Sequence, residues 1–245
     1  MRTILYLITL PLATVFYGGT CIVARWFGVK RVEGGVYDWA QRNWARTILR
    51  ASGVPVTVEG GEHLTARTAE VVAANHASFF DIMALLGYLP VDAKFVAKKE
   101  LFRVPLFGAA IKAAGHVRLD RQNIKEAFGA YEVAARRIRD EQLHVLVYPE
   151  GTRTRTGEML PFKKGPFVLA IACAAPVVPL YVQGAFGIQP KGSVRVRPRP
   201  LRIAIGRPIP TAGLTYDDRD ALAQQVREAM LALKAQLDTG RVAAP

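Results

Sequence analysis

Apolar and polar residues follow several distinct patterns along the chain, and each pattern predicts a different kind of element. Residues 3–24 contain no charged side chain, and they are flanked by Arg2, Arg25, Lys30 and Arg31. A helix of about 22 residues is roughly 33 Å long, which is comparable to the hydrocarbon core of a bilayer. We therefore expect a membrane-associated helix in this segment.

Alternatives to a membrane-spanning anchor remain open for this segment. A secretory signal peptide has a similar basic start and apolar middle, but no small-x-small cleavage site is well placed before Trp26, which favours a retained segment. Pro11, Gly18 and Gly19 would interrupt a helix, and basic residues at both ends fit a simple spanning orientation poorly. A helix that enters one leaflet and turns back is therefore an alternative to one that crosses the bilayer.

The next segment has the period of an amphipathic helix. Residues on two different stripes recur at helical spacing: Val36, Trp39, Ala40, Trp44, Thr47 and Ile48 on one, and Arg42, Arg46 and Arg50 on the other. Tryptophan at the headgroup boundary and arginine on anionic lipid would suit an interfacial helix. An ordinary helix, packed on the main domain with a solvated basic face, fits equally well. We predict that residues 1–50 form a membrane-associated helical pair.

From Ala51 onward, short apolar strands alternate with helical stretches. This pattern predicts one α/β domain over residues 51–245, with a mixed, mostly parallel sheet flanked by helices. Residues 144–148 and 177–182 are nearly all apolar, which is typical of central strands covered on both faces. The prolines within residues 193–206 predict an edge strand there. The other expected strands are 54–59, 71–75, 94–97 and 116–119, and the expected helices are 78–89, 106–114, 124–140 and 217–237.

The charge of the chain narrows the class of partner. A formal net charge of +13 implies anionic partners, but its sign does not separate nucleic acid from acidic phospholipid or a phosphorylated metabolite. The uncharged N-terminal segment favours lipid, and the basic region 193–206 lacks aromatic residues that could stack on bases. Cys21 and Cys173 are the only cysteines, so neither a disulfide framework nor a zinc spacing is present.

A histidine and a carboxylate lie five residues apart at the end of the predicted strand 71–75. Histidine can take a proton from an alcohol when a carboxylate fixes its tautomer and stabilises the imidazolium. Positions five apart on a helix differ by about 140°, so His76 must lie in the turn before the helix, with Ser78 as cap and Asp81 in the first turn. The alternative without catalysis is that His76 simply ends the strand while Asp81 caps the helix.

Further polar segments also follow predicted strands. In the sequence YPEGTR, Gly151 permits a tight turn whose amides can approach an anion, and Arg153 offers a planar fork for phosphate, with Glu150 beside it to hold the arginine. The alternative is a β-turn with a surface ion pair. Basic residues near other strand ends, among them Lys98 and Arg121, would suit a phosphorylated substrate, whereas a solvated basic rim is the simpler interpretation.

Four blocks, in this order, resemble the motifs of the glycerolipid acyltransferase family: NHASFFD, KKELFRVPLFGAAIKAAGHVRLDR, YPEGTR and VVPLYV. The similarity covers residues 51–206 and is greatest to the bacterial 1-acyl-sn-glycerol-3-phosphate acyltransferases. It implies transfer of an acyl chain from acyl-CoA or acyl carrier protein to the sn-2 hydroxyl of 1-acyl-glycerol-3-phosphate. The product would be phosphatidic acid for phospholipid synthesis, made at the cytoplasmic face of the bacterial inner membrane.

The resemblance also implies a role for individual residues. His76 would be the base and Asp81 its partner, whereas the acceptor phosphate would be bound by Arg121, Glu150, Gly151, Arg153 and Lys98. Besides the thioester co-substrate, no cofactor and no metal is implied. The implied partners are the bilayer, the lysophospholipid and the acyl thioester, with acyl carrier protein as an alternative donor to coenzyme A, and nucleic acid is not among them.

Alternatives to this activity remain at the level of the sequence. Arg118 stands where the family often has an apolar or aromatic residue, which leaves open another acceptor such as a lyso-ornithine lipid. A non-catalytic, membrane-tethered polyanion-binding protein is the alternative from a different class. No G-x-S-x-G elbow occurs and Cys173 has no evident base partner, so direct transfer without an acyl-enzyme is expected.

Overall fold

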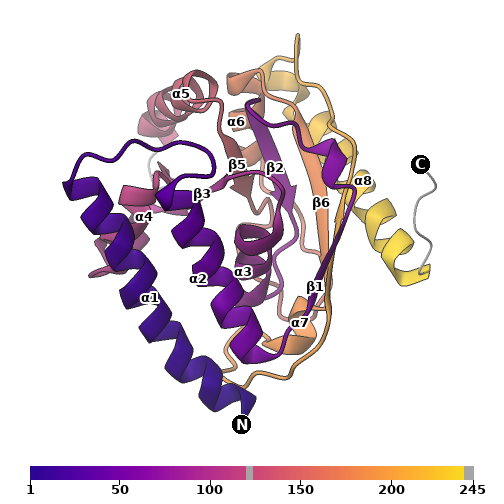
Figure 1. Cartoon of the computed structure of the whole chain (residues 1–245). Helices are drawn as coiled ribbons and strands as arrows, with labels where there is room; N and C mark the ends of the chain where they lie inside the picture. Colours follow the sequence, from indigo (N-terminus) through magenta and orange to yellow (C-terminus); the bar gives the residue numbers. More distant parts are fainter. Residues whose placement is uncertain (120–123, 240–245) are drawn as a thin grey trace.

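The structure is a computed structural model that describes residues 1–119 and 124–239. Within these residues, a seven-stranded sheet with the order β1-β7-β6-β2-β5-β3-β4 forms the centre of the molecule (Figure 1). All neighbouring strands are parallel except β6 and β7, which confirms the predicted mixed, mostly parallel sheet. The strands are β1 (Val56–Glu59), β2 (Glu70–Ala74), β3 (Ala93–Lys98), β4 (Val117–Leu119), β5 (His144–Val147), β6 (Val177–Gln183) and β7 (Leu201–Ile205).

Helices cover both faces of the sheet, so alternate residues of the central strand β2 enter two different cores. Val72 and Ala74 pack with α3, whereas Val71 and Ala73 pack with α5, α6 and α8. This double burial explains why the central strands are apolar throughout, as predicted for β5 and β6. The helices of the domain are α3 (Phe79–Tyr88), α4 (Phe107–Ala114), α5 (Ile124–Asp140), α6 (Gly165–Cys173), α7 (Ala185–Ile188) and α8 (Arg219–Thr239).

The predicted edge strand over residues 193–206 is wrong in both its length and its position. Only Leu201–Ile205 form a strand, β7, and this strand lies between β1 and β6 rather than at the edge of the sheet. The prolines precede and follow these five residues, so every residue of β7 keeps its backbone N–H for the sheet. The order of apolar and polar residues also fails to predict α6. An apolar run that is buried on most sides does not alternate with the period of a helix.

The N-terminal residues form two helices, α1 (Arg2–Trp26) and α2 (Val36–Ser52), that lie side by side (Figure 1). The predicted interruption of α1 is wrong, because the helix continues through Pro11 and the glycine pair. Gly18 has a packing role instead: a Cβ there would lie only 3.2 Å from the Ala110 Cβ, so glycine lets α1 approach α4 closely.

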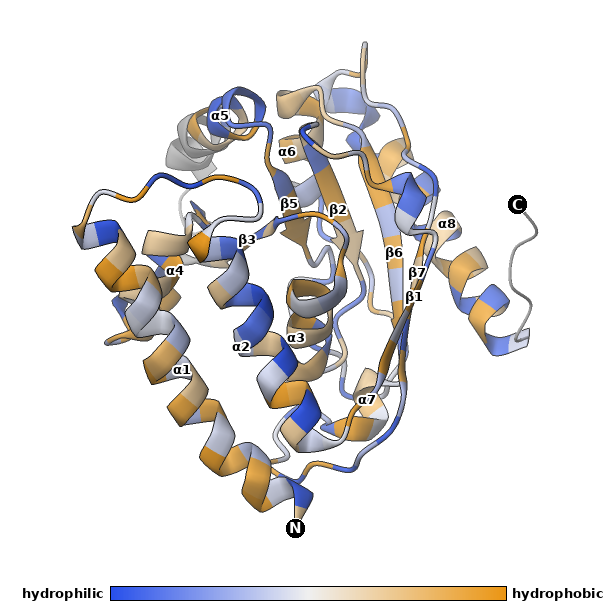
Figure 2. Ribbon diagram, viewed as in Figure 1, coloured by the Kyte–Doolittle hydropathy of each residue, from blue (hydrophilic) through white to orange (hydrophobic). Residues whose placement is uncertain are grey.

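The outer face of α1 is apolar and exposed (Figure 2). By length and composition alone, α1 could cross a membrane. Its most exposed apolar side chains are Ile4, Leu7, Ile8, Leu12, Val15, Phe16, Val23 and Trp26.

The arginine stripe of α2 serves the neighbouring helix α3. Arg46 Nε donates to the Gly87 carbonyl at 2.7 Å, and Arg42 Nη1 donates to the Leu89 carbonyl. These carbonyls belong to the last turn of α3 and its cap, which have no partner within the helix. The contacts of Arg42 and Arg46 therefore match the alternative of a helix packed on the main domain. The division of the chain into residues 1–50 and 51–245 stays a prediction.

Candidate active site

Several predicted site residues come together at the carboxyl ends of the parallel strands β2, β5 and β3. His76 follows β2, Glu150 and Gly151 follow β5, and Lys98 ends β3. In α/β sheets this edge is where ligands bind. Asn75 fixes the end of β2 to β6, since its Oδ1 accepts the Val182 N–H at 2.7 Å and its Nδ2 donates to the Val182 carbonyl at 3.1 Å.

His76 and Asp81 meet as the sequence predicts. Ser78 caps α3, and Asp81 lies in the first turn and completes a capping box with the Ser78 backbone. The Nδ1 atom of His76 lies 3.1 Å from both carboxylate oxygens of Asp81. An ionised carboxylate only accepts, so Nδ1 carries the proton and Nε2 keeps its lone pair. The pair therefore presents Nε2 as the basic atom.

Asp81 is fully buried and is surrounded by donors. Its Oδ2 accepts the backbone N–H groups of Ala77 and Ser78, both at 2.8 Å, and its Oδ1 accepts the Tyr148 hydroxyl at 3.3 Å. These bonds compensate the loss of hydration of a buried charge. One carboxylate thus caps the helix and also contacts the histidine, so the capping role of Asp81 does not exclude its predicted pairing with His76.

Tyr148 belongs to this site, although the sequence analysis assigns it no role. Its ring stacks on the His76 ring with centroids 3.9 Å apart and an interplanar angle of 17°. Burial and the neighbouring Asp81 raise the pKa of Tyr148 well above 10, so its hydroxyl stays protonated and keeps donating to the carboxylate. Tyr148 therefore supports both members of the pair.

We expect Tyr148→Phe to lower kcat about 2- to 10-fold, because the variant loses one hydrogen bond to Asp81 but keeps the stacked ring. Steady-state kinetics on the purified variant measure this. Tyr148→Leu, which also removes the stack, should lower kcat further. Equal rates for the wild type and both variants would show that Tyr148 plays no part.

Glu150 acts through the backbone. It is buried, and its Oε1 accepts the His76 N–H while its Oε2 accepts the Leu160 N–H, both at 2.8 Å. Burial raises the pKa of Glu150, and the two backbone donors oppose this rise. A carboxylate held in this way positions the turn that carries His76, and the predicted contact to Arg153 is not among its bonds. Gly151 has φ +72°, the left-handed conformation that glycine adopts without strain.

The structure describes the remaining predicted phosphate-binding residues, Arg153, Lys98 and Arg121, to different extents. The Arg153 guanidinium lies over the Phe79 ring, 5.4 Å from its centroid. Lys98 lies at the end of β3, where the structure describes the backbone but not the side chain. Arg121 lies outside the described residues. A further cation that the sequence analysis misses is Lys191, whose Nζ donates to the Thr152 hydroxyl at 2.8 Å.

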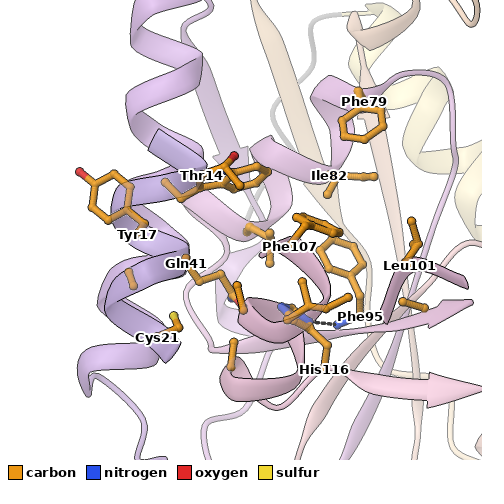
Figure 3. A pocket seen from close by; sticks show the side chains of 18 of the residues that line it. Thr14, Tyr17, Cys21, Gln41, Phe79, Ile82, Phe95, Leu101, Phe107 and His116 are labelled. Carbon is orange, nitrogen blue, oxygen red and sulfur yellow. Dashed lines mark hydrogen bonds between the residues drawn. The ribbon is translucent and has the colours of Figure 1, made fainter. Parts of the chain in front are cut away.

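A largely apolar pocket with a volume of about 300 Å³ opens beside the pair, and His76, Tyr148 and Gly151 are among the residues that line it. The wall is built from both N-terminal helices, α3, β3 and α4 (Figure 3). Among its side chains are Tyr17, Trp44, Phe79, Ile82, Phe95, Leu101 and Phe107. A pocket of this composition suits a hydrocarbon chain.

His116, in the wall of this pocket, makes the free energy of unfolding depend on pH. Burial, with the charges of Lys94 and Arg137, lowers the pKa of His116 to about 3. Between that value and the unfolded pKa near 6.5, the unfolded chain binds a proton that the folded chain does not, so stability falls as pH falls.

We expect a pH change from 7 to 5 to reduce the free energy of unfolding by about 2 kcal/mol through His116. His116→Gln keeps an acceptor for the Phe95 N–H but does not titrate, so this part of the loss should disappear. Thermal unfolding of both proteins at the two pH values measures the difference. Parallel pH profiles of wild type and variant would contradict the assignment.

The cysteines offer no nucleophile. Burial raises the pKa of Cys21 to about 11 and that of Cys173 to about 12, so both are thiols at neutral pH. Within residues 1–119 and 124–239, no group of three or more His, Cys, Asp and Glu side chains is placed to hold a metal ion.

A histidine–carboxylate pair beside an apolar pocket, on a mixed sheet with an exposed apolar helix, is the arrangement expected of an enzyme that acts on a lipid. Comparison with known proteins agrees: the sequence model of the family described as Acyltransferase matches residues 55–183. The chain belongs to the acyltransferase family. The resemblance inferred from the four sequence blocks is thereby confirmed.

Individual relatives show how far the similarity extends. The 1-acyl-sn-glycerol-3-phosphate acyltransferase of Cocos nucifera is 37% identical over 190 residues, covering 78% of this chain and 60% of the relative. The human alpha enzyme of the same name is 34% identical, covering 76% of this chain and 66% of the relative. The chain thus spans about three-fifths of the length of the Cocos nucifera relative.

A solved structure resembles nearly the whole chain. The crystal structure of the 1-acyl-sn-glycerophosphate (LPA) acyltransferase PlsC from Thermotoga maritima superposes with a TM-score of 0.79 at 26% identity. The match covers 96% of this chain and 94% of that one. The similarity therefore includes the N-terminal helices as well as the sheet.

Proposed function

We propose that this acyltransferase moves an acyl chain from a thioester to the sn-2 hydroxyl of 1-acyl-glycerol-3-phosphate, giving phosphatidic acid for phospholipid synthesis. The observation that carries the proposal is the His76–Asp81 pair, which presents Nε2 beside a pocket suited to a hydrocarbon chain. The names of the similar proteins support this choice of acceptor.

The mechanism follows from the protonation of the pair. Nε2 of His76 takes the proton of the acceptor hydroxyl while that oxygen attacks the thioester carbonyl, and Asp81 stabilises the imidazolium. The tetrahedral intermediate then collapses by breaking the C–S bond, and the imidazolium returns its proton to the departing thiolate. The products are an ester and a free thiol, so no acyl-enzyme, cofactor or metal takes part.

The acceptor phosphate needs cations within reach of His76. Arg153 lies three residues beyond Glu150, whose carboxylate holds the His76 amide, so the guanidinium and the base are attached to one rigid unit. We assign phosphate binding to Arg153, with Lys98 and Arg121 as further candidates. Glu150 and Gly151 contribute indirectly, through the shape of the turn.

The substrates imply a membrane setting. A lysophospholipid resides in a bilayer, and α1 exposes a continuous apolar face next to the helix α2 that helps to line the pocket. We assign the protein to the cytoplasmic face of the bacterial inner membrane, where acyl-CoA or acyl carrier protein supplies the thioester. The basic charge of the chain suits anionic lipid there.

The exposed face of α1 provides a test of membrane association. We expect the double substitution Leu12→Asp and Phe16→Asp, at side chains 65% and 62% exposed, to weaken binding to anionic vesicles at least about tenfold, because charges in the acyl boundary are unfavourable. Vesicle sedimentation measures this. The matched control is the pair Gln224→Asp and Gln225→Asp on the exposed surface of α8. Equal binding of both double variants would refute the role of α1.

Product analysis tests the acceptor. The purified protein receives an acyl thioester together with lysophosphatidate or lyso-ornithine lipid, and mass spectrometry identifies the lipid formed. Phosphatidic acid as the main product supports the proposal, whereas acylation of lyso-ornithine lipid alone would move the activity to another acceptor. Absence of any product, with salt-sensitive lipid binding that is unaffected by His76→Ala, would favour the non-catalytic alternative.

A further inference from the structure

Two long stretches of the chain contain no acidic residue, and the structure brings them together. Residues 1–32 and 159–216 include no Asp and no Glu, although the second stretch carries eight Lys and Arg side chains. The N-terminus of α1 lies beside the connection from α7 to β7 (Figure 1). There, Thr3 Oγ1 accepts the Val196 N–H at 3.0 Å and donates to the Val196 carbonyl at 3.3 Å. The two stretches thus contribute cations but no carboxylate to the surface around this contact.

The cations of this surface are concentrated in residues 193–200, which we call the arginine segment. Arg195, Arg197 and Arg199 are all exposed. Among the residues that the structure describes, none of these three side chains forms an ion pair or a hydrogen bond. Their charges are therefore not used within the fold and are available to an anionic partner.

The fold holds this segment in an extended form with the arginines outward. Val196 is only 4% exposed and belongs to the core that also contains Tyr6 of α1. Pro198 and Pro200 have no backbone N–H, and each disfavours a helical conformation at the residue before it. The guanidinium groups are thus presented by a backbone that is already ordered, which reduces the entropy lost when a partner binds.

The arginine segment lies at the same edge of the sheet as the active site. It precedes β7, which runs antiparallel to β6, so it is near the carboxyl ends of the parallel strands and near His76. Two contacts just before it confirm this position. The Gln189 carbonyl accepts the Ser78 hydroxyl at 2.8 Å, and Lys191 Nζ donates to the Thr152 hydroxyl at 2.8 Å. A partner of the arginines therefore lies close to the active-site edge.

Exposed apolar side chains adjoin the arginines. Val194, within the arginine segment, is 70% exposed, and the first turns of α1 expose Ile4, Leu7 and Ile8 (Figure 2). An anionic bilayer offers phosphate groups to the arginines and acyl chains to the apolar residues beside them. An acidic protein matches the arginines alone. The combination of charge and exposed apolar surface therefore favours a bilayer as the partner.

We propose that the arginine segment binds the headgroups of anionic phospholipids and so holds the active-site edge of the sheet against the bilayer. In this arrangement α1 provides affinity for any bilayer, whereas the arginines provide the preference for an anionic one. This inference rests on the membrane setting described under the proposed function, and it goes beyond that setting by naming the side chains and the class of lipid that they select.

Vesicle binding without substrate tests the proposal. Sedimentation compares the wild type with the triple variant Arg195→Gln, Arg197→Gln and Arg199→Gln, on vesicles of phosphatidylglycerol and of phosphatidylcholine. A basic residue near an anionic membrane strengthens binding about fivefold. We therefore expect the triple variant to bind phosphatidylglycerol about 10- to 100-fold more weakly than the wild type, and phosphatidylcholine within about twofold of it. A triple variant that keeps the wild-type preference for phosphatidylglycerol overturns the proposal.

The matched control removes three exposed arginines from the opposite edge of the sheet: Arg67→Gln, Arg136→Gln and Arg207→Gln. Arg67 precedes β2, Arg136 lies in α5 before β5, and Arg207 follows β7. The net charge changes equally in both triple variants, so the control should bind phosphatidylglycerol within about threefold of the wild type. Equal losses in both would show an effect of net charge alone and overturn the proposal.

Thermal unfolding verifies that these variants fold. If the triple variant of the arginine segment does not fold, the double variant Arg195→Gln and Arg197→Gln gives the same test, with an expected loss of about 5- to 25-fold on phosphatidylglycerol. A double variant that folds and keeps the wild-type preference overturns the proposal as well.

Kinetics identify what the arginines bind. With hexanoyl lysophosphatidate dissolved as monomers, the triple variant should have kcat/KM within about twofold of the wild type. With lysophosphatidate in phosphatidylglycerol vesicles, its rate should fall at least about tenfold, because the protein leaves the bilayer. An equal loss on monomers would mean that the arginines bind the substrate phosphate. A loss that occurs with a carrier-protein thioester but not with a coenzyme A thioester would make an acidic protein the partner. Either result overturns the proposal.

The outcomes also separate this inference from the proposed function. A wild type that binds both kinds of vesicle equally, and still transfers acyl chains, would refute the role of the arginine segment alone. A preference for phosphatidylglycerol that depends on the arginines, without any acyl transfer, would refute the proposed function alone.

Discussion

His76→Ala should reduce acyl transfer on the order of 1,000-fold or more while the protein stays folded. The variant loses the only atom placed to take the proton of the acceptor, Nε2, among the residues that the structure describes around Asp81. The backbone of the turn is unaffected, because the residue 76 N–H still donates to Glu150 and its carbonyl still accepts the Thr154 N–H at 2.9 Å. Release of free thiol from the acyl thioester measures the rate.

The matched control for this experiment is His63→Ala. His63 is partly exposed, lies outside the pocket lining and bonds to the Ile205 carbonyl at 2.8 Å. Its removal should leave the transfer rate within about twofold of the wild type, and thermal unfolding of both variants verifies that they fold. A His76→Ala protein that folds and retains most of the wild-type rate would end the assignment of His76 as the base.

The geometry of the pair could be predicted from the sequence because it is local. His76, Ser78 and Asp81 belong to one strand–turn–helix unit, so the five-residue spacing and the capping rule together determine where the side chains meet. Most strands and helices were predictable for the same reason, since burial on one or both faces leaves a period in the sequence.

The features that could not be predicted from the sequence depend on contacts between segments that are far apart in the chain. Tyr148 reaches Asp81 across 67 positions of sequence, and the role of Glu150 depends on an amide 74 positions away. The prolines within residues 193–206 led to the wrong prediction of an edge strand. A proline outside a strand does not prevent that strand from lying between two others, as β7 does. The hydrogen bond from the Gln41 amide to the Ala93 carbonyl likewise depends on the packing of α2 beside β3.

Asp81 is the residue at which stability and chemistry depend on the same atoms, and Asp81→Asn separates them. One amide oxygen can replace Oδ2 as the acceptor of the Ala77 and Ser78 N–H groups, so α3 keeps most of its cap. The amide NH₂ then faces His76 Nδ1 and donates to it, which moves the imidazole proton to Nε2 and removes the base.

We therefore expect Asp81→Asn to lower kcat about 1,000- to 10,000-fold and to reduce the free energy of unfolding by only about 1 to 3 kcal/mol. Ser78→Ala is the opposite case: it removes the side-chain cap of α3, at about 1 kcal/mol, but leaves Asp81 on His76, so kcat should fall less than about tenfold. Thioester-release kinetics and chemical denaturation on the same preparations measure both quantities. If the two variants lose activity in proportion to their loss of stability, Asp81 is only a helix cap, and the orientation of His76 must come from Tyr148 and Glu150 instead.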